Sequence, residues 1–328
     1  MHLNASEDRT PSHTAAGAAR TAVLALIAAV FLALAASAPN LTRVAAGRAD
    51  IPADPPAPLP QGLVIPSYAA GPMPLHPGEQ LVFRASWIGI PAAEARILVS
   101  GDEQDPRLWK GEVWVRTSPG VDLLYKLRDY LHEEFSRASM APRALYIKQS
   151  ENQRNSEYRL SFDRSARVVT AVKRNKRGSA TSRFASDNPF GPVSGAIMAL
   201  SQPLRVGQKL RFDVFTARSR YVIDFTVAGR ERISTPLGDF DALRVIPAIA
   251  YMSDESAHPH PRRTTLWISA DKRHLPLRIE TTAFVGKLRA ELIQIGNAPP
   301  LSASPEATPS PTERQGAANQ RDSHQILM

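Results

Sequence analysis

Acidic residues are the first candidates for chemistry in this chain. Five of them lie in or near the ends of expected strands: Glu94, Asp129, Asp187, Asp224 and Asp271. Two carboxylates held about 5 to 9 Å apart can hydrolyse a glycosidic bond. Aspartate more often caps a turn or pairs with an arginine, and Arg128 directly precedes Asp129. We therefore keep Asp129 with Asp187 as an alternative acidic pair and assign no catalytic residue.

Metal and nucleophile chemistry has little support in the sequence. His258 and His260 follow Asp254, and two histidines one residue apart on a strand can share a metal. Pro259 separates them, which indicates an exposed loop instead. The chain has no cysteine, which excludes disulfides and thiolate-ligated metals. It has no Gly-x-Ser-x-Gly elbow and no phosphate-binding glycine loop. We expect no metal and no cofactor, and the sequence favours a non-enzymatic protein over an enzyme.

A basic segment is the strongest candidate for a charged contact. The net charge of the chain is +9, and most of the excess falls in residues 75–296. The segment is an expected hairpin tip with one arginine nearby: Lys173, Arg174, Lys176, Arg177 and Arg183. It can contact anionic head groups or glycan, or it can be a solvated hairpin whose charge prevents edge-to-edge pairing. The tip carries no interleaved aromatic residue, which argues against nucleic acid.

The N-terminal region indicates export. Residues 22–38 are apolar except for Ser37, Arg20 precedes them, and Ala36 to Ala38 form a small-x-small site. This is the layout of a cleaved signal peptide. An uncleaved membrane anchor, which needs about 20 apolar residues, is the alternative. Both interpretations predict the periplasm or cell envelope, with the chain either secreted across the inner membrane or anchored to it by this apolar helix.

Composition divides the rest of the chain into three parts. Residues 39–77 hold ten of the 28 prolines, so residues 39–74 are expected to be a linker. Residues 297–328 are rich in Pro, Ser, Ala and Gln, which predicts a disordered tail. Residues 75–296 remain as one folded domain, and a domain of this size can bury a sizeable core without disulfides.

Hydrophobic periodicity predicts the fold of residues 75–296. Apolar and polar residues alternate in eleven or twelve short runs, most regularly after Gly207. Residues 192–200 are the clearest helix, and residues 121–127 are a second short one. The domain is therefore predicted to be mainly β, a large curved antiparallel sheet closing toward a barrel or half-barrel. Its apolar face, either plain core or a ligand concavity, is expected to contain Trp87, Trp109, Trp114, Phe212, Phe225 and Trp267.

Several landmarks in this order resemble the domain of unknown function 3108 family of exported bacterial proteins. The matching segments span residues 75–292: residues 77–83 and 87–90, Arg128-Asp129, residues 187–189, 206–208 and 235–240, Trp267 with Asp271, and residues 275–277 and 286–292. Ala93 departs from the glycine common there, and residues 252–263 look like a local insertion.

The resemblance implies a curved sheet, similar to the open half-barrels of periplasmic lipoprotein carriers, and implies no activity. We therefore expect an uncharacterised envelope protein that is a non-enzymatic binding or scaffold domain. Its ligand would be apolar, amphipathic or anionic, such as a lipid or lipopolysaccharide-like molecule, or its partner an envelope protein. Residues 22–38 would give membrane association. The alternative is an envelope hydrolase that acts on glycan or lipid through Asp129 and Asp187.

Overall fold

The computed structural model describes residues 55–252, 257–259, 263–282 and 286–297. The predicted signal or anchor lies outside these residues, as do Asp254, His260 and the predicted tail apart from its first residue, Asn297, which ends the last strand. Among the helices of the described ranges, none has both the length and the apolar character needed to cross a membrane.

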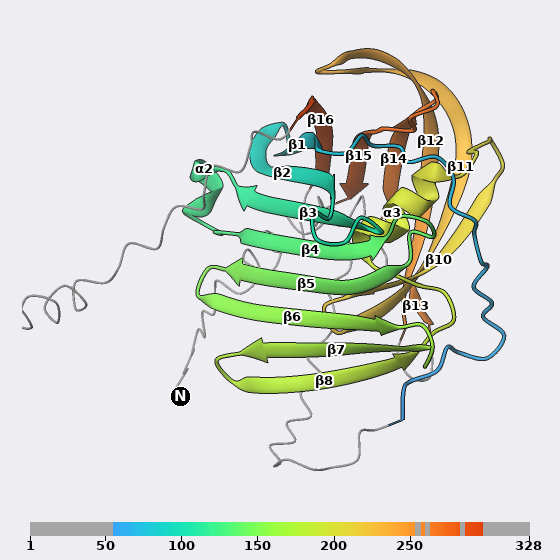
Figure 1. Cartoon of the computed structure of the whole chain (residues 1–328). Coiled ribbons are helices and arrows are strands. Elements are labelled where there is room, and N and C mark those ends of the chain that lie inside the picture. The colour runs from blue at the N-terminus through green and yellow to red at the C-terminus, as the bar shows by residue number, and fades with distance from the viewer. Residues whose placement is uncertain (1–54, 253–256, 260–262, 283–285, 298–328) are drawn as a thin grey trace, which may run out of the picture. The chain divides into compact units, whose positions relative to one another are not determined.

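Two short helices and many strands form the described domain (Figure 1). The helices are α2 (Pro119–Asp122) and α3 (Pro192–Ser201). The first group of strands is β1 (Glu79–Trp87), β2 (Ile90–Gly101), β3 (Leu108–Thr117), β4 (Arg128–Ser136), β5 (Pro142–Glu151), β6 (Arg154–Asp163), β7 (Val168–Asn175) and β8 (Gly178–Ala185). The second group is β9 (Pro189–Phe190), β10 (Lys209–Thr216), β11 (Ser219–Thr235), β12 (Gly238–Met252), β13 (Ala257–Pro259), β14 (Thr264–Ser269), β15 (Pro276–Thr282) and β16 (Lys287–Asn297).

All the described strands belong to one sheet. Its order is β8-β7-β6-β5-β4-β3-β2-β1-β16-β15-β14-β12-β11-β10-β9, and β13 pairs with β12. Neighbours are antiparallel except β9 and β10. The prediction of a mainly β domain with one large sheet is confirmed. The predicted closure is not: in the described residues β8 and β9 are the two ends of the sheet and do not pair.

Two strands have no counterpart in the sequence prediction: β9 has two residues and β13 has three. The sequence predicts β8 only as the second arm of the hairpin whose tip is residues 173–178, because its sequence GSATSRFA lacks apolar alternation. Each forms because a neighbouring strand supplies hydrogen-bond partners, which local periodicity cannot reveal.

The first eight strands form an up-and-down meander, so their connections alternate between two edges. The β1–β2, β3–β4, β5–β6 and β7–β8 connections lie at one edge together with α2, and we call it the α2 edge. The β2–β3, β4–β5 and β6–β7 connections lie at the opposite edge. Figure 1 shows the α2 edge on the left.

The core follows the two-residue period of the strands. In β1, Leu81, Phe83 and Ala85 are buried, and Trp109 and Phe212 are buried as predicted. Trp87, Phe225 and Trp267 are half-buried against the same core. Trp114 was wrongly predicted to be in the core.

The error at Trp114 has a simple origin. Trp114 lies between the inward Val113 and Val115, so it faces outward, where its ring is 5.6 Å from that of Tyr130. The aromatic character of the residue suggested burial, but the phase of the strand places its side chain on the outer face.

Side chains, not backbone pairs, join β8 to β10. Ser186 Oγ donates to Asp213 Oδ2 at 2.6 Å, and Arg218 Nε donates to Ser182 Oγ at 3.0 Å. The rings of Phe184 and Phe215 are 5.4 Å apart. Contacts of this kind explain how the domain buries its core although the sheet remains open.

Residues 57–74, which we call the strap, cross from β8 to β10 and α3. Ala57 N–H donates to Arg183 O at 2.9 Å at the β8 end. Farther along, Tyr68 stacks on Phe212 with ring centroids 4.9 Å apart, and its hydroxyl accepts a hydrogen bond from Arg211 N at 2.8 Å. This part of the predicted linker therefore packs on the domain.

Candidate ligand-binding site

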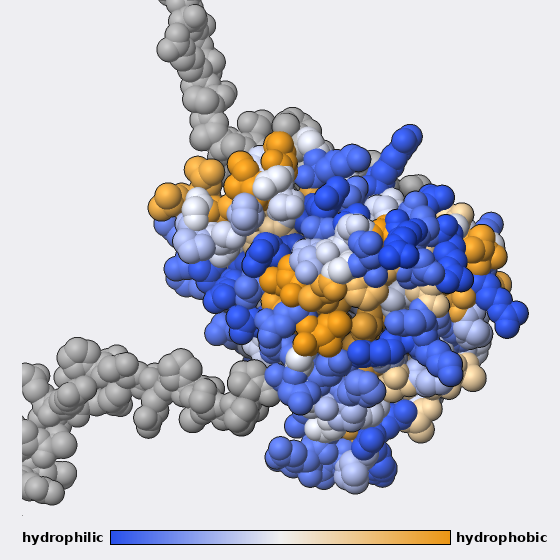
Figure 2. All heavy atoms as spheres, turned by 90° about the horizontal axis from the view of Figure 1, so that it is seen from above, coloured by the Kyte–Doolittle hydropathy of each residue, from blue (hydrophilic) through white to orange (hydrophobic). Residues whose placement is uncertain are grey.

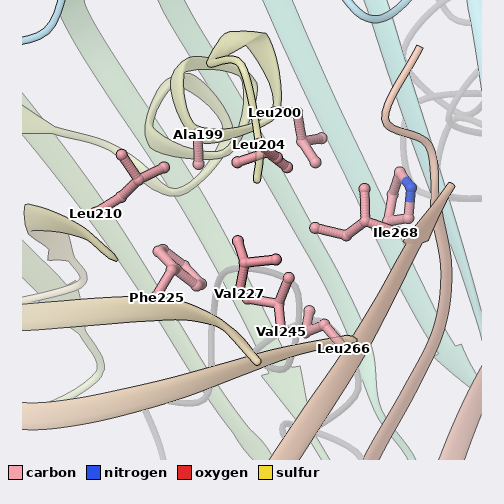
Figure 3. A pocket seen from close by; sticks show the side chains of 10 residues that line it. Ala199, Leu200, Leu204, Leu210, Phe225, Val227, Val245, Leu266 and Ile268 are labelled. Carbon is pink, nitrogen blue, oxygen red and sulfur yellow. The ribbon is translucent and has the colours of Figure 1, made fainter. Parts of the chain in front are cut away.

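An apolar pocket lies between α3 and the second half of the sheet. Ala199, Leu200 and Leu204 contribute from α3 and the segment after it, opposite strand residues whose side chains point toward them (Figure 3). The strand residues are Leu210, Phe225, Val227, Val245, Leu266, Ile268 and Pro276. Every lining residue is apolar, so the pocket offers no polar group to a ligand.

The pocket is small in this conformation. Its cavity measures about 30 Å³, comparable to the share of one water molecule in the liquid. Binding sites for whole small molecules are roughly ten times larger or more. An acyl chain can therefore enter only if α3 moves away from the strands.

Glu133 holds the first turn of α3. Its Oε2 accepts a hydrogen bond from Val193 N at 2.8 Å, and its Oε1 accepts one from Ser194 N at 3.2 Å. Pro192 is at the start of the helix and has no N–H to satisfy. The carboxylate thus supplies the partners that the N-terminal N–H groups of a helix lack.

The surroundings of Glu133 are closely packed. Burial raises the pKa of this carboxyl to about 7, although hydrogen bonds from Ser194 and Val193 oppose the shift. A Cβ added at Gly191 would lie 2.3 Å from Glu133 Oε1, and one added at Gly111 would lie 2.5 Å from Val193 Cγ1. Glycine at both positions therefore allows α3 to approach β3 and β4 closely.

Three hydrogen bonds hold the other end of α3. His274 Nδ1 donates to Leu200 O at 2.8 Å, and Gly71 N in the strap donates to Ser201 Oγ at 3.2 Å. Gln202 Nε2 donates to Ala69 O at 3.0 Å. The helix that covers the pocket is thus attached at each end by a few identifiable hydrogen bonds.

The predicted acidic pair is not brought together. Asp129 lies near the start of β4 at the α2 edge, where its Oδ1 accepts from Ser150 N at 2.9 Å. Asp187 follows β8 at the opposite edge and pairs with Arg167. The structure therefore separates the two carboxylates by the length of the strands.

Asp129 and the other acidic candidates all have structural partners. Burial raises the pKa of Asp129 to about 7, opposed by the Ser150 hydrogen bond and increased by the charge of Glu151. Asp224 pairs with Arg211 at 2.6 Å. Glu94 pairs with Arg116 at 3.0 Å, and Asp271 accepts from Ser269 Oγ at 2.7 Å in a turn. Within the described ranges, no group of three or more His, Asp or Glu side chains could hold a metal ion.

The predicted basic tip lies at the α2 edge. Lys173 and Arg174 belong to the end of β7, Lys176 and Arg177 form the turn, and Arg183 is farther along β8. The Lys173 amine lies over the Tyr158 ring at 5.7 Å, and burial lowers its pKa. Arg174, Lys176 and Arg177 are exposed, whereas Lys173 and Arg183 are half-buried, so the basic residues are distributed over a hairpin and only some of them face solvent.

Sequence reasoning missed Glu133 and the buried pair of Asp213 and Arg220. Glu133 alternates in phase with Leu131 and Phe135, so a glutamate at an inward position was the available signal. Asp213 alternates out of phase with the inward residues of β10. It is buried because the β8 side of the domain covers it, and no local pattern shows this.

Several solved structures match this chain in structure over about two thirds of its length but share little sequence with it. A β-barrel-like protein of domain of unknown function DUF1849 from Brucella abortus is 7% identical, with a TM-score of 0.45; the match covers 68% of this chain and 98% of that one. A Bacteroides fragilis protein of YmcC-like fold is 13% identical, with a TM-score of 0.28, over 70% of this chain and 100% of that one. The hypothetical lipoprotein YmcC of Escherichia coli is 9% identical, with a TM-score of 0.25, over 69% and 87%.

Each TM-score is below 0.5. The chain matches none of the curated proteins. Residues 82–293 match the family model described as Protein of unknown function (DUF3108), as the sequence landmarks suggested. Because this match spans more than half of the chain, the chain belongs to the DUF3108 family.

Proposed function

We propose that this chain is a non-enzymatic binding protein of the cell envelope that takes an apolar or amphipathic ligand between α3 and the sheet. The observation that carries the proposal is the pocket beneath α3, whose ten lining residues are all apolar. Such a lining recognises hydrocarbon and rejects charged groups, because a charge there would lose its hydration without gaining a partner.

The envelope location is part of the proposal. It rests on the apolar residues 22–38, which are preceded by Arg20 and closed by a small-x-small site. A protein of the envelope meets acyl chains of lipids and lipoproteins, which are ligands of the class that the pocket accepts.

Ligand entry requires α3 to separate from the strands. The hydrogen bonds at the two ends of the helix, from Val193 and Ser194 to Glu133 and from His274 to Leu200, resist this movement. An acyl chain would then lie between α3 and the strand residues Phe225, Val227 and Leu266, which line the pocket opposite the helix. The closed pocket is on this account the unliganded state of the site.

A binding experiment tests this proposal. A pyrene-labelled fatty acid is titrated into the purified chain and followed by fluorescence. The double variant Val227→Ile with Val245→Ile adds two methylene groups to the pocket and should weaken binding at least about tenfold. The same substitutions at the exposed Val64 and Val206 are the matched control and should leave affinity unchanged.

Two results would overturn the proposal. One is absence of saturable binding by the wild-type chain. The other is equal affinity in the pocket variant and the exposed control, which would place the probe elsewhere. If neither result is obtained and binding depends on the pocket, native mass spectrometry of the chain purified from its own envelope would identify the natural ligand.

A further inference from the structure

The β1–β2 hairpin exposes two isoleucines. Ile88 is 58% exposed and Ile90 is 66% exposed. Ile88 has a φ of 51° and is followed by Gly89 at 79°. This turn geometry favours Asn or Gly at the first position, and a β-branched residue is strained in it. Ile88 is therefore both strained and exposed, and strained positions of this kind concentrate at functional sites.

Two leucines extend beside this hairpin. Leu123 is 89% exposed and Leu124 is 82% exposed in the turn that follows α2. Ser118 N donates to Ala92 O at 2.9 Å, which places the start of α2 next to β2. Ile88, Ile90, Leu123 and Leu124, which we call the apolar prongs, therefore lie at neighbouring connections of the α2 edge. The surface view shows apolar groups standing among hydrophilic side chains (Figure 2).

The α2 edge is also strongly basic. Residues 116–128, 150–154 and 173–177 contain eight basic residues and two acidic ones. The connections at the opposite edge, residues 102–107, 137–143, 163–167 and 186–188, contain five of each. The charge is therefore concentrated at the edge that carries the prongs. The turn of the β7–β8 hairpin lies four strands from β3, roughly 19 Å away at the usual strand spacing.

We propose that the α2 edge docks on the surface of a lipid bilayer that carries anionic head groups. The prongs would enter the interfacial region, where exposed leucine and isoleucine leave water. Lys126, Lys176 and Arg177 would lie over the phosphates, since basic residues near an anionic surface are attracted to it. The protruding apolar side chains match the apolar interior of such a bilayer surface, and the excess of positive charge matches its anionic head groups.

This surface is separate from the pocket. The prongs lie at the connections of β1, β2 and β3, whereas the pocket lies between α3 and β10 to β15. Docking therefore does not require the proposed ligand, and the two proposals can fail independently.

Site-specific labelling tests the docking in the full chain. The absence of cysteine allows a single environment-sensitive fluorophore at Leu124→Cys, with Gln104→Cys at the opposite edge as the matched control. Vesicles are made of phosphatidylcholine alone or with phosphatidylglycerol. We expect a blue shift and quenching by brominated lipid for the label at 124, only with the anionic vesicles. Residues 22–38 are present in both variants, so any anchoring by them does not distinguish the labels.

Charge variants provide the second measurement. Lys126→Gln, Lys176→Gln and Arg177→Gln together should lower the apparent affinity for anionic vesicles at least about tenfold. Arg107→Gln, Arg143→Gln and Arg164→Gln remove the same charge from exposed positions at the opposite edge and should lower it much less.

Three outcomes would overturn the proposal. The label at 124 could stay in water with anionic vesicles, or the two charge variants could lose affinity equally. The label at 124 could also become buried only after envelope proteins are added, which would identify the prongs as a protein-binding surface.

Discussion

Glu133 Oε2 and Val193 N lie 2.8 Å apart, so a carboxylate on β4 directly holds the first turn of α3. Glu133 has no measurable exposure, and its partners belong to the helix that covers the apolar pocket. The position of the first turn of α3 therefore depends on one buried ionisable group. This relationship connects the stability of the domain with pH and with opening of the pocket.

The pH dependence of stability should reveal the titration of Glu133. Its pKa is raised from 4.5 to about 7 in the folded chain, so between these values the folded state binds more protons than the unfolded state. This contribution is fully present below pH 4.5 and is lost as the pH rises through 7. Wild type should lose up to about 3 kcal/mol relative to Glu133→Gln across that window.

Urea unfolding of both proteins at intervals from pH 5 to pH 8 measures this difference. Asp129 also titrates in this range, but it does so in both proteins, and the comparison isolates Glu133. Parallel stability curves for wild type and Glu133→Gln would contradict the prediction.

Gly111→Ala should destabilise the domain by about 1 to 3 kcal/mol, because a forced contact in a packed core costs that much. The new Cβ would lie 2.5 Å from Val193 Cγ1. Val193→Ala removes the clashing methyl groups, so the double variant should be more stable than the sum of the single effects predicts. Additive effects in urea unfolding would show that the two residues do not contact. Gly120→Ala, where an added Cβ meets nothing within 4 Å, is the matched control.

Removing either member of the buried pair of Asp213 and Arg220 should cost about 3 to 5 kcal/mol. Arg220 Nη2 donates to Asp213 Oδ2 at 2.7 Å, and both side chains are almost fully buried. Asp213→Asn and Arg220→Met each leave an uncompensated polar group, whereas the double variant removes the charge of both. Thermal unfolding should show that the double variant is destabilised by much less than the sum of the two single variants. The exposed pair of Asp241 and Arg230, treated in the same way, should show little coupling.

Tyr68→Phe should loosen the strap without unfolding the domain. The Tyr68 hydroxyl accepts from Arg211 N at 2.8 Å, and loss of one such hydrogen bond costs about 1 kcal/mol. The ring would still stack on Phe212. Hydrogen exchange at the Arg211 amide should become faster, while amides of β4 stay protected. Unchanged exchange at Arg211 would show that the hydroxyl does not hold this amide.

Local periodicity in the sequence is enough to predict most of the strands and the helix α3. Alternation at Leu81, Phe83 and Ala85 fixes which face of β1 is buried, and Pro192 with the apolar residues after it predicts α3. The family could also be recognised, because its landmarks are turns, such as residues 235–240, whose geometry depends on short local sequences. These features need no knowledge of distant residues.

What those elements enclose depends on contacts between residues far apart in the chain. The two ends of the sheet, β8 and β9, do not pair, and β8 is joined to β10 instead by Asp213, Phe215 and the strap. Glu133 becomes the holder of α3 only because a helix 60 residues later begins at its carboxylate. Asp129 and Asp187 are separated because the meander places their connections at opposite edges. Such outcomes depend on contacts between residues far apart in the chain, and a local pattern does not encode them.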